Sequence, residues 1–267
     1  MQKKEKRLII NADDLGISEE VNETIRKCFL HQSITGTSII ACGKKFDEAC
    51  SMMRDIGRAE IGAHLTVTGE FTPCMDDLGH IGTLLQGEGS FPKEYGQLTL
   101  KYLTGKIKIN VIMREFEAQI LKIREAGFQI THLDSHEHIH MLPGIFKITA
   151  GLARKYRIPY IRIPNEPLYV IKKSFRTIDL IRYAALKTLS VFGRKHAGLT
   201  CNTAFLGHFH SGRITDDILK FLISSVPPGI TEIALHPGSA EPTLTLKNTL
   251  DSSKIKLVTH KESAEAV

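Results

Sequence analysis

The feature of this 267-residue chain that most constrains its fold is a repeated alternation of strand and helix patterns. Short apolar runs typical of buried strands are separated by stretches with helical periodicity. Alternation of this kind predicts an α/β fold built on a parallel sheet. About seven strands in a chain of this length favour a distorted or incomplete (β/α) barrel over an open doubly wound sheet. The predicted strands span residues 7–12, 36–42, 60–67, 128–136, 159–163, 201–206 and 231–236.

Capping signals mark several helices between these strands. Ser18 is expected to cap a helix that has two glutamates in its first turn. Gly127 is expected to close a helix over about residues 108–126, and Pro143 to start the next one. Further helices are predicted near residues 45–56, 174–192 and 215–225.

Residues 70–107 depart from the alternation. This segment is irregular and rich in glycine, and we interpret it as an insertion or lid over one end of the sheet. The chain shows no internal repeat, so we expect a single domain over residues 1–267. No GxGxxG or GxxxxGK[ST] sequence follows the first strand, which argues against a nucleotide-binding fold.

The charge of the chain does not indicate a nucleic-acid partner. The formal net charge is +6, but the basic residues form no dense stripe with interleaved aromatic residues. The basic side chains of residues 170–195 are typical of a solvated helix face. Contact between this segment and a membrane surface or an anionic substrate is the alternative.

The lengths of the apolar runs and the pattern of the cysteines indicate the cellular compartment of the protein. No stretch approaches the roughly 18 apolar residues of a membrane span, and the apolar run after the basic N-terminus is too short for a signal peptide. The five cysteines form no CxxC pair, so we expect small buried side chains rather than a disulfide framework. We therefore expect a cytoplasmic protein.

Polar side chains gather where the predicted strands end. The segment HLDSHEHIHMLPG, residues 132–144, places histidines and aspartate at alternate positions, which is the strand period. In a parallel barrel the carboxyl ends of the strands share one face, and active sites form there. The residues at or just after these ends are Asp13, Asp14, His64, Asp134, His136, Arg162, Asn165, His208, His210 and His236.

Histidines with a carboxylate are typical of a divalent metal site with an open coordination position. We expect Asp14, His64 and His136, from three different strands, to be the ligands. Asp13 is then available to take a proton from water, and His236 to give one to a leaving group. Together these groups predict hydrolysis of an amide or ester.

Each residue also has a simpler interpretation. Asp14 could cap a helix, His64 could be a hydrogen-bonded core histidine, and Arg162 could pair with a nearby acid. His138 and His140 lie past the strand end, where they could contact substrate, orient ligands or cap the loop. The coincidence of the whole set at one face favours the functional interpretation.

Four motifs carry a family resemblance: LIINADDLGIS, IGAHLTV, THLDSHEHIHMLPGIF and TEIALHPG. In this order, over about residues 7–240, the chain resembles the YdjC-like carbohydrate deacetylase family. That family includes chito-oligosaccharide monodeacetylases and deacetylases associated with hopanoid biosynthesis. Leu15 stands where the family usually has phenylalanine, an apolar exchange that touches no ligand.

The resemblance implies a barrel related to the NodB-type polysaccharide deacetylases. It implies hydrolysis of an N-acetyl group on an amino sugar, with release of acetate. By motif position, it assigns Asp14, His64 and His136 to the metal, Asp13 to the base and His236 to the acid. We expect one divalent ion, Zn or Mg, and the two imidazoles favour zinc. The expected substrate-binding residues are Arg162, His138, His140 and Asn165.

The substrate stays open between a soluble oligosaccharide and a glycolipid. Residues 176–207 resemble the hopanoid-associated branch, and a glycolipid substrate would entail peripheral membrane contact. A homo-oligomer also stays open. The alternatives are another metal-dependent amide or ester hydrolase on a β/α barrel, or a non-catalytic sugar-binding protein.

Overall fold

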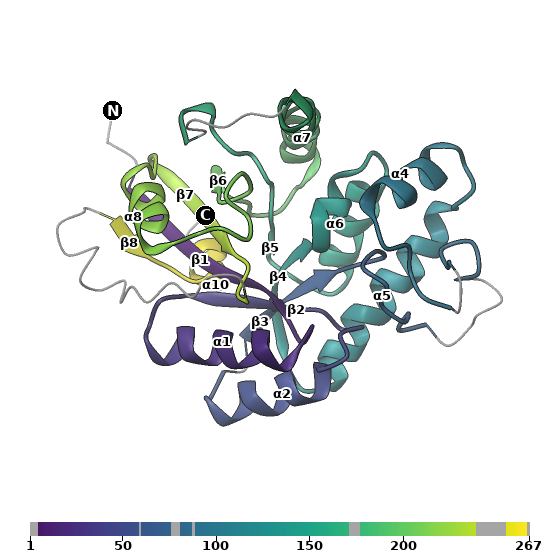
Figure 1. Ribbon diagram of the computed structural model, residues 1–267, viewed down its shortest axis with the longest axis horizontal. Coiled ribbons are helices and arrows are strands. Elements are labelled where there is room, and N and C mark those ends of the chain that lie inside the picture. The colour runs from purple at the N-terminus through teal and green to yellow at the C-terminus, as the bar shows by residue number, and fades with distance from the viewer. Residues whose placement is uncertain are drawn as a thin grey trace.

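The computed structural model describes residues 5–58, 60–75, 81–86, 89–170, 177–238 and 255–265. Its centre is a curled parallel sheet with helices on the outside (Figure 1). The strand order is β5-β4-β3-β2-β1-β7-β6, with β8 paired to the start of β1. The strands are β1 (Lys6–Leu15), β2 (Gly36–Ile39), β3 (Glu60–Leu65), β4 (Gln129–Ser135), β5 (Tyr160–Ile161), β6 (Ala204–Leu206), β7 (Gly229–Leu235) and β8 (Ile255–Leu257).

The seven predicted strands are confirmed, and so is the incomplete barrel. The outermost strands of the sheet, β5 and β6, do not form a ladder with each other in the described residues. Two separate backbone hydrogen bonds join the segments around them, from Ile161 N to Thr200 O at 3.0 Å and from Phe205 N to Asn165 O at 3.2 Å. The Asn202 side chain adds two more, accepting from Ile163 N at 2.8 Å and donating to Ile163 O at 2.6 Å. The sequence analysis did not predict β8.

Most helices follow the predicted signals. Ser18 caps α1, accepting from Val21 N at 3.2 Å, and Gly127 follows α5 with φ of 91°. Pro143 does not start a helix: α6 begins two residues later, after Gly144. The helices are α1 (Glu19–Leu30), α2 (Phe46–Asp55), α4 (Tyr95–Leu103), α5 (Ile109–Glu125), α6 (Ile145–Lys155), α7 (Thr177–His196), α8 (Asp216–Ser224) and α10 (His260–Glu265).

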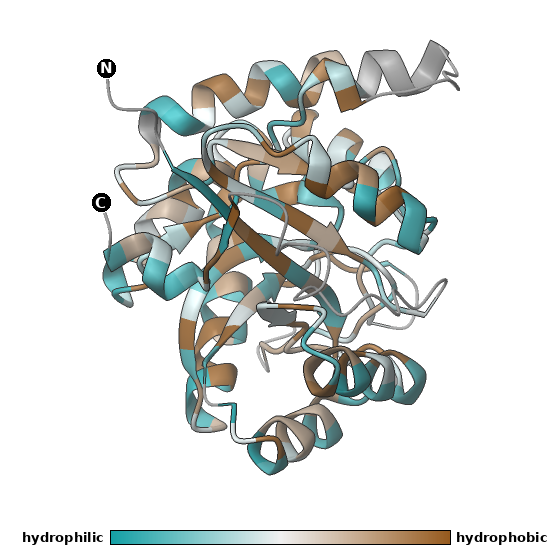
Figure 2. Ribbon diagram, turned by 90° about the vertical axis from the view of Figure 1, so that its left-hand side faces the viewer, coloured by the Kyte–Doolittle hydropathy of each residue, from teal (hydrophilic) through white to brown (hydrophobic). Residues whose placement is uncertain are grey.

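The two faces of β1 show how the barrel is filled. Leu8, Ile10 and Ala12 belong to the large apolar core beneath the helices. The alternate residues Asn11 and Asp13 are also buried but polar. Figure 2 shows mainly apolar residues along the central strands and a mixture of apolar and hydrophilic residues on the surrounding helices. The barrel interior is therefore a buried polar space with its own hydrogen-bond network.

The segment at residues 70–107 begins at the carboxyl end of β3 and leads to α5. It contains α4, where the sequence predicted irregular structure. Tyr102 of α4 donates to Pro143 O at 2.6 Å, in the loop that follows β4. The described part of the chain contains no helix long and apolar enough to cross a membrane.

Candidate metal and catalytic centre

A bulge at the end of β1 separates the roles of two neighbouring aspartates. The pairing of β1 with β2 is irregular between Ala12 and Leu15. Asp14 has a left-handed backbone, with φ of 66°, which is uncommon for a residue other than glycine. Bulges of this kind re-aim side chains next to active sites. Asp13 therefore points into the barrel interior, and Asp14 turns toward β3 and β4.

Asp14, His64 and His136 converge as the sequence predicted. Asp14 Oδ1 lies 3.3 Å from His64 Nε2 and 3.1 Å from His136 Nδ1. One potential ligand atom from each residue lies within 4.8 Å of the other two. His64 is the penultimate residue of β3, and His136 directly follows β4. The ends of β1, β3 and β4 thus supply a carboxylate and two imidazoles to one point.

His64 is held in one orientation by its second nitrogen. Its Nδ1 lies 2.9 Å from Asp134 Oδ1, and Ser38 Oγ donates to Asp134 Oδ2 at 2.8 Å. This leaves Nε2 directed at Asp14. Burial alone would lower the pKa of His64, but the carboxylates of Asp134, Asp14 and Asp13 together outweigh it and raise the pKa to about 10. A divalent cation would take the place of the Nε2 proton, as a metal-bound imidazole requires.

Asp13 is a buried carboxylate held by Arg162. Arg162 Nη1 and Nη2 donate to its two oxygens at 2.6 and 2.8 Å, and Asn11 Nδ2 donates to Oδ1 at 2.8 Å. Burial would raise the pKa of Asp13, but the charge and hydrogen bonds of Arg162 lower it to about 2. The carboxylate therefore stays ionised at neutral pH.

Arg162 does not reach the surface, where we expected it to bind substrate. Its side chain is fully buried. Besides Asp13, it pairs with Asp134 at 2.8 Å and with Glu232 at 2.7 Å. This environment leaves it no exposed atom for a ligand. Its contacts instead connect Asp13 with Asp134, the carboxylate that orients His64.

His236 follows β7 and flanks Asp13 on the side away from β2. Its Nε2 lies 3.9 Å from Asp13 Oδ2, and its Nδ1 lies 3.3 Å from Ser211 Oγ. The side chain is 30% exposed. It is thus close to the ionised aspartate and still open to solvent, which is the environment expected of a proton donor.

The other three residues that we expected to bind substrate, His140, Asn165 and His138, lie in different environments. His140 is fully buried between Ser135 Oγ and Arg162 O, so it fixes the loop after β4. Asn165 accepts from Lys187 Nζ at 2.6 Å. His138 is half-buried, and its ring lies 5.2 Å from that of His208 between centroids. Of these residues, His138 and Asn165 keep some exposed surface.

Several residues of this network were not assigned a role from the sequence. Asn11 and Ser38 gave no signal that separates them from ordinary buried polar residues. Glu232 did give one, because it is a lone charge within the apolar strand GITEIAL. A buried charge needs a partner, and here that partner is Arg162.

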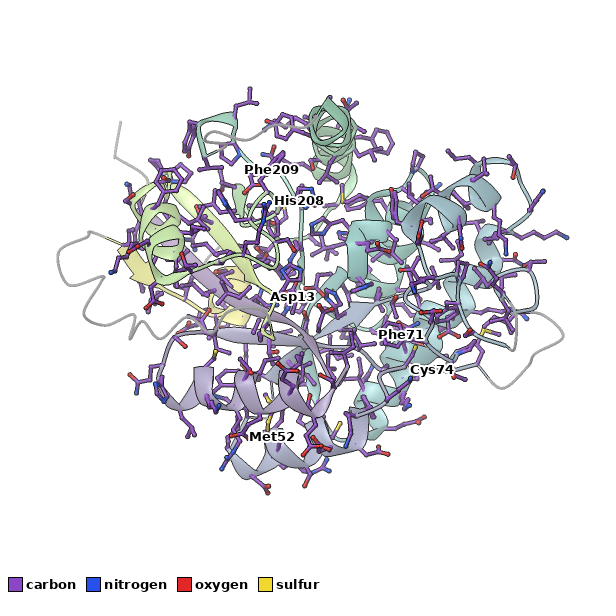
Figure 3. All side chains as sticks on the ribbon, in the orientation of Figure 1. Asp13, Met52, Phe71, Cys74, His208 and Phe209 are labelled. Atoms are coloured by element: carbon purple, nitrogen blue, oxygen red, sulfur yellow. The ribbon has the colours of Figure 1, made fainter. Side chains whose placement is uncertain are left out.

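The mouth of the centre lies between two chain segments. In Figure 3, Asp13 lies near the middle of the molecule, with His208 above it and Phe71 to its lower right. Phe71 belongs to the segment at residues 70–107, and its ring lies 6.2 Å from that of His136 between centroids. The start of that segment therefore borders the centre, at the carboxyl end of the sheet.

Comparison with known proteins agrees with the motifs. The YdjC-like protein family matches residues 7–266. A protein of Geobacillus stearothermophilus named carbohydrate deacetylase is 27% identical, over 86% of this chain and 78% of its own length. A Xenopus laevis protein of the same name is 30% identical, over 87% of this chain and 81% of its own.

A solved structure shares the fold. It is a protein of Enterococcus faecalis V583, named for a proposed role in cellobiose-phosphate cleavage, with a TM-score of 0.74 and 23% identity. The superposition covers 97% of this chain and 99% of the other. With the family match extending over nearly the whole sequence, the chain belongs to the YdjC-like family.

Proposed function

We propose that the protein is a metal-dependent carbohydrate deacetylase, which hydrolyses the N-acetyl group of an amino sugar and releases acetate. The observation that carries the proposal is the convergence of Asp14, His64 and His136 beside the ionised carboxylate of Asp13. The names of the relatives support the carbohydrate substrate and the deacetylation.

The ligand set fits one divalent ion. Two imidazoles and a carboxylate favour zinc or another transition ion over magnesium, which prefers more oxygen ligands. When bound, the ion supplies Lewis-acid activation of a water molecule and of the acetyl carbonyl.

Asp13 and His236 divide the proton transfers. Asp13 accepts the proton of the attacking water, and Arg162 keeps this carboxylate ionised and in position until then. His236, partly exposed beside Asp13, donates a proton to the amine nitrogen as the C–N bond breaks. Acetate and the free amino sugar are the products.

The N-acetyl sugar is either soluble or attached to a lipid. The segment at residues 70–107 borders the mouth through Phe71, so it contributes to substrate choice. Four apolar side chains at residues 168–169 and 191–192 are more than half exposed, which supports peripheral membrane contact by a cytoplasmic enzyme acting on a glycolipid. They are Leu168, Tyr169, Val191 and Phe192.

Acetate release from a panel of soluble and lipid-linked N-acetylated sugars tests this function. We expect release that is abolished by a chelator and restored by zinc. Sugar binding without acetate release from any substrate would instead indicate a binding protein. Hydrolysis confined to non-sugar amides or esters would contradict the carbohydrate substrate.

A further inference from the structure

Two cysteines that are distant in sequence meet a buried glutamate outside the centre described above. Cys42 lies after β2, and Cys74 lies in the segment at residues 70–107. Their sulfur atoms are 3.4 Å apart, and Cys42 Sγ lies 3.6 Å from Glu115 Oε1 on α5. The three ligand atoms lie within 4.8 Å of one another, and none of these residues belongs to the Asp14 centre. Both cysteines are mostly buried but keep some exposed surface, whereas we expected buried side chains.

These separations match the coordination sphere of a metal. Bonds of about 2.3 Å to sulfur and 2.1 Å to oxygen at tetrahedral angles place neighbouring ligand atoms roughly 3.6–3.8 Å apart. The observed 3.4 and 3.6 Å are within a few tenths of an ångström of these values. No large movement of the chain is needed to bring the three ligands onto one ion.

The glutamate is fixed in place by neutral donors. Glu115 is fully buried and accepts from Cys74 N at 2.9 Å, Met75 N at 3.1 Å and Gln119 Nε2 at 2.8 Å. In the described part of the chain, no lysine, arginine or histidine forms an ion pair with it. A buried carboxylate without a cationic partner is costly when ionised.

The Cys42 thiol contacts another thiol and a carboxyl group. The hydrogen bond with Cys74, burial and the nearby Glu115 raise the pKa of Cys42 well above its ordinary value, and burial raises the pKa of Glu115. A cation would displace the protons of these groups and balance their charges. Sulfur ligands select zinc and other thiophilic ions over magnesium or calcium.

The turn that carries Cys42 is closely packed. A side chain at the next residue, Gly43, would lie 2.2 Å from Gly16 O, so the turn packs directly against the backbone after β1. Cys74 is tied to α5 through its backbone amide. Two fixed segments thus present thiols to the same point, as a preformed site requires.

We propose that Cys42, Cys74 and Glu115 form a second metal site, which takes one thiophilic divalent cation such as Zn²⁺ and is independent of the Asp14 centre. An ion there joins the turn after β2 to the segment at residues 70–107. Phe71, three residues before Cys74, contacts His136, so the site fixes the edge of the active-site mouth.

Cobalt titration of the full-length protein tests the proposal. The protein is stripped of metal and reduced with a reductant that is not a thiol, and near-ultraviolet absorption from thiolate-to-cobalt charge transfer is recorded. We expect one thiolate-bound cobalt per chain, displaced by zinc. Because the Asp14 centre has no sulfur ligand, this band reports the second site alone.

Matched variants localise the signal. Cys42→Ser and Cys74→Ser should each remove the charge-transfer band, whereas Cys201→Ser and Asp14→Ala should keep it. Glu115→Gln keeps both thiols and the size of the side chain, and it should weaken cobalt binding by more than about tenfold. Absence of the band in the wild-type protein would overturn the proposal. So would a band that survives in either serine variant, unchanged affinity in Glu115→Gln, or a Cys42–Cys74 disulfide in protein purified without oxygen.

Discussion

Arg162 and Asp13 form a two-point ion pair at the bottom of the active site, with N–O distances of 2.6 and 2.8 Å and almost no exposure of either side chain. The same guanidinium contacts Asp134 and Glu232. One buried cation is therefore shared by three buried carboxylates. Its removal would take away the cation that all three carboxylates share, in a region of low dielectric.

Replacement of Arg162 tests this arrangement. Arg162→Met should lower the free energy of unfolding by roughly 3–5 kcal/mol, because uncompensated buried charges remain. Arg162→Lys keeps the charge but not the two-point geometry, and its loss should be smaller. Denaturant titration measures both, with the exposed Arg194→Lys as the control. A loss below about 1 kcal/mol in Arg162→Met would place the pair among weak surface salt bridges.

Asp134 should act through His64 rather than on the substrate. Asp134→Asn removes the charge that holds His64 Nδ1 and should weaken metal binding at the Asp14 centre by roughly 10–100-fold. Ser38→Ala leaves the Asp134 contact in place, so its effect should be smaller. Competition with a metal indicator gives both affinities. Equal affinities for Asp134→Asn and wild type would show that His64 needs no orienting carboxylate.

The loss of activity on replacing His236 should depend on how strongly the leaving group of the substrate needs a proton. His236→Ala should lower acetate release from an N-acetyl sugar by roughly 10²–10⁴-fold, the usual contribution of a general acid. Hydrolysis of an activated aryl acetate should fall much less, because its leaving group departs without a proton. Steady-state kinetics on the two substrates compare the losses. Equal losses on both would assign His236 to another task.

The buried carboxyl group of Glu166 should make the stability of the protein depend on pH. Its carboxylate is buried and accepts from the backbone amides of Gly207 and Phe209, in the loop that carries Ser211. Burial raises the pKa of Glu166 from 4.5 to about 7, against the opposing effect of these hydrogen bonds. The folded protein therefore holds this proton more tightly than the unfolded chain does.

The stability of the folded protein therefore falls as the pH rises between these two pKa values. Below about pH 4.5 the side chain is protonated in both states, and its contribution to stability is fully present. As the pH rises to about 7 the unfolded chain ionises first, so roughly 3 kcal/mol of stability is lost, with no further change above. Glu166→Gln lacks this ionisation. The difference in unfolding free energy between wild type and Glu166→Gln should change over this window, and a constant difference would contradict the raised pKa.

The strands were predictable because each is a short apolar run between turn signals. The three residues of β8 are too few for any periodicity, and their pairing with β1 depends on distant chain. Asp14, His64 and His136 were brought together by one rule, that parallel strands end on a shared face. That rule places a residue at the mouth but does not say which way its side chain points.

Arg162 and His140 show this limit. Both follow the carboxyl-end pattern, yet both are fully buried. Arg162 points inward because three carboxylates inside the barrel require a cation, a need visible only once Asp13, Asp134 and Glu232 are placed together. The Cys42–Cys74 pair likewise depends on how residues 70–75 return to the turn after β2. The spacing of the two cysteines in the sequence does not predict that their side chains meet.

Metal content and acetate-release kinetics, measured together on wild type, Asp14→Ala and Asp13→Asn, test the central claim most directly. Asp14→Ala should lose one ion per chain relative to wild type, and its activity with it. Asp13→Asn should keep its metal while its turnover falls by roughly 10²–10⁴-fold. Near-normal turnover of Asp13→Asn, or a loss of metal as complete as that of Asp14→Ala, would contradict the division between a ligand and a base.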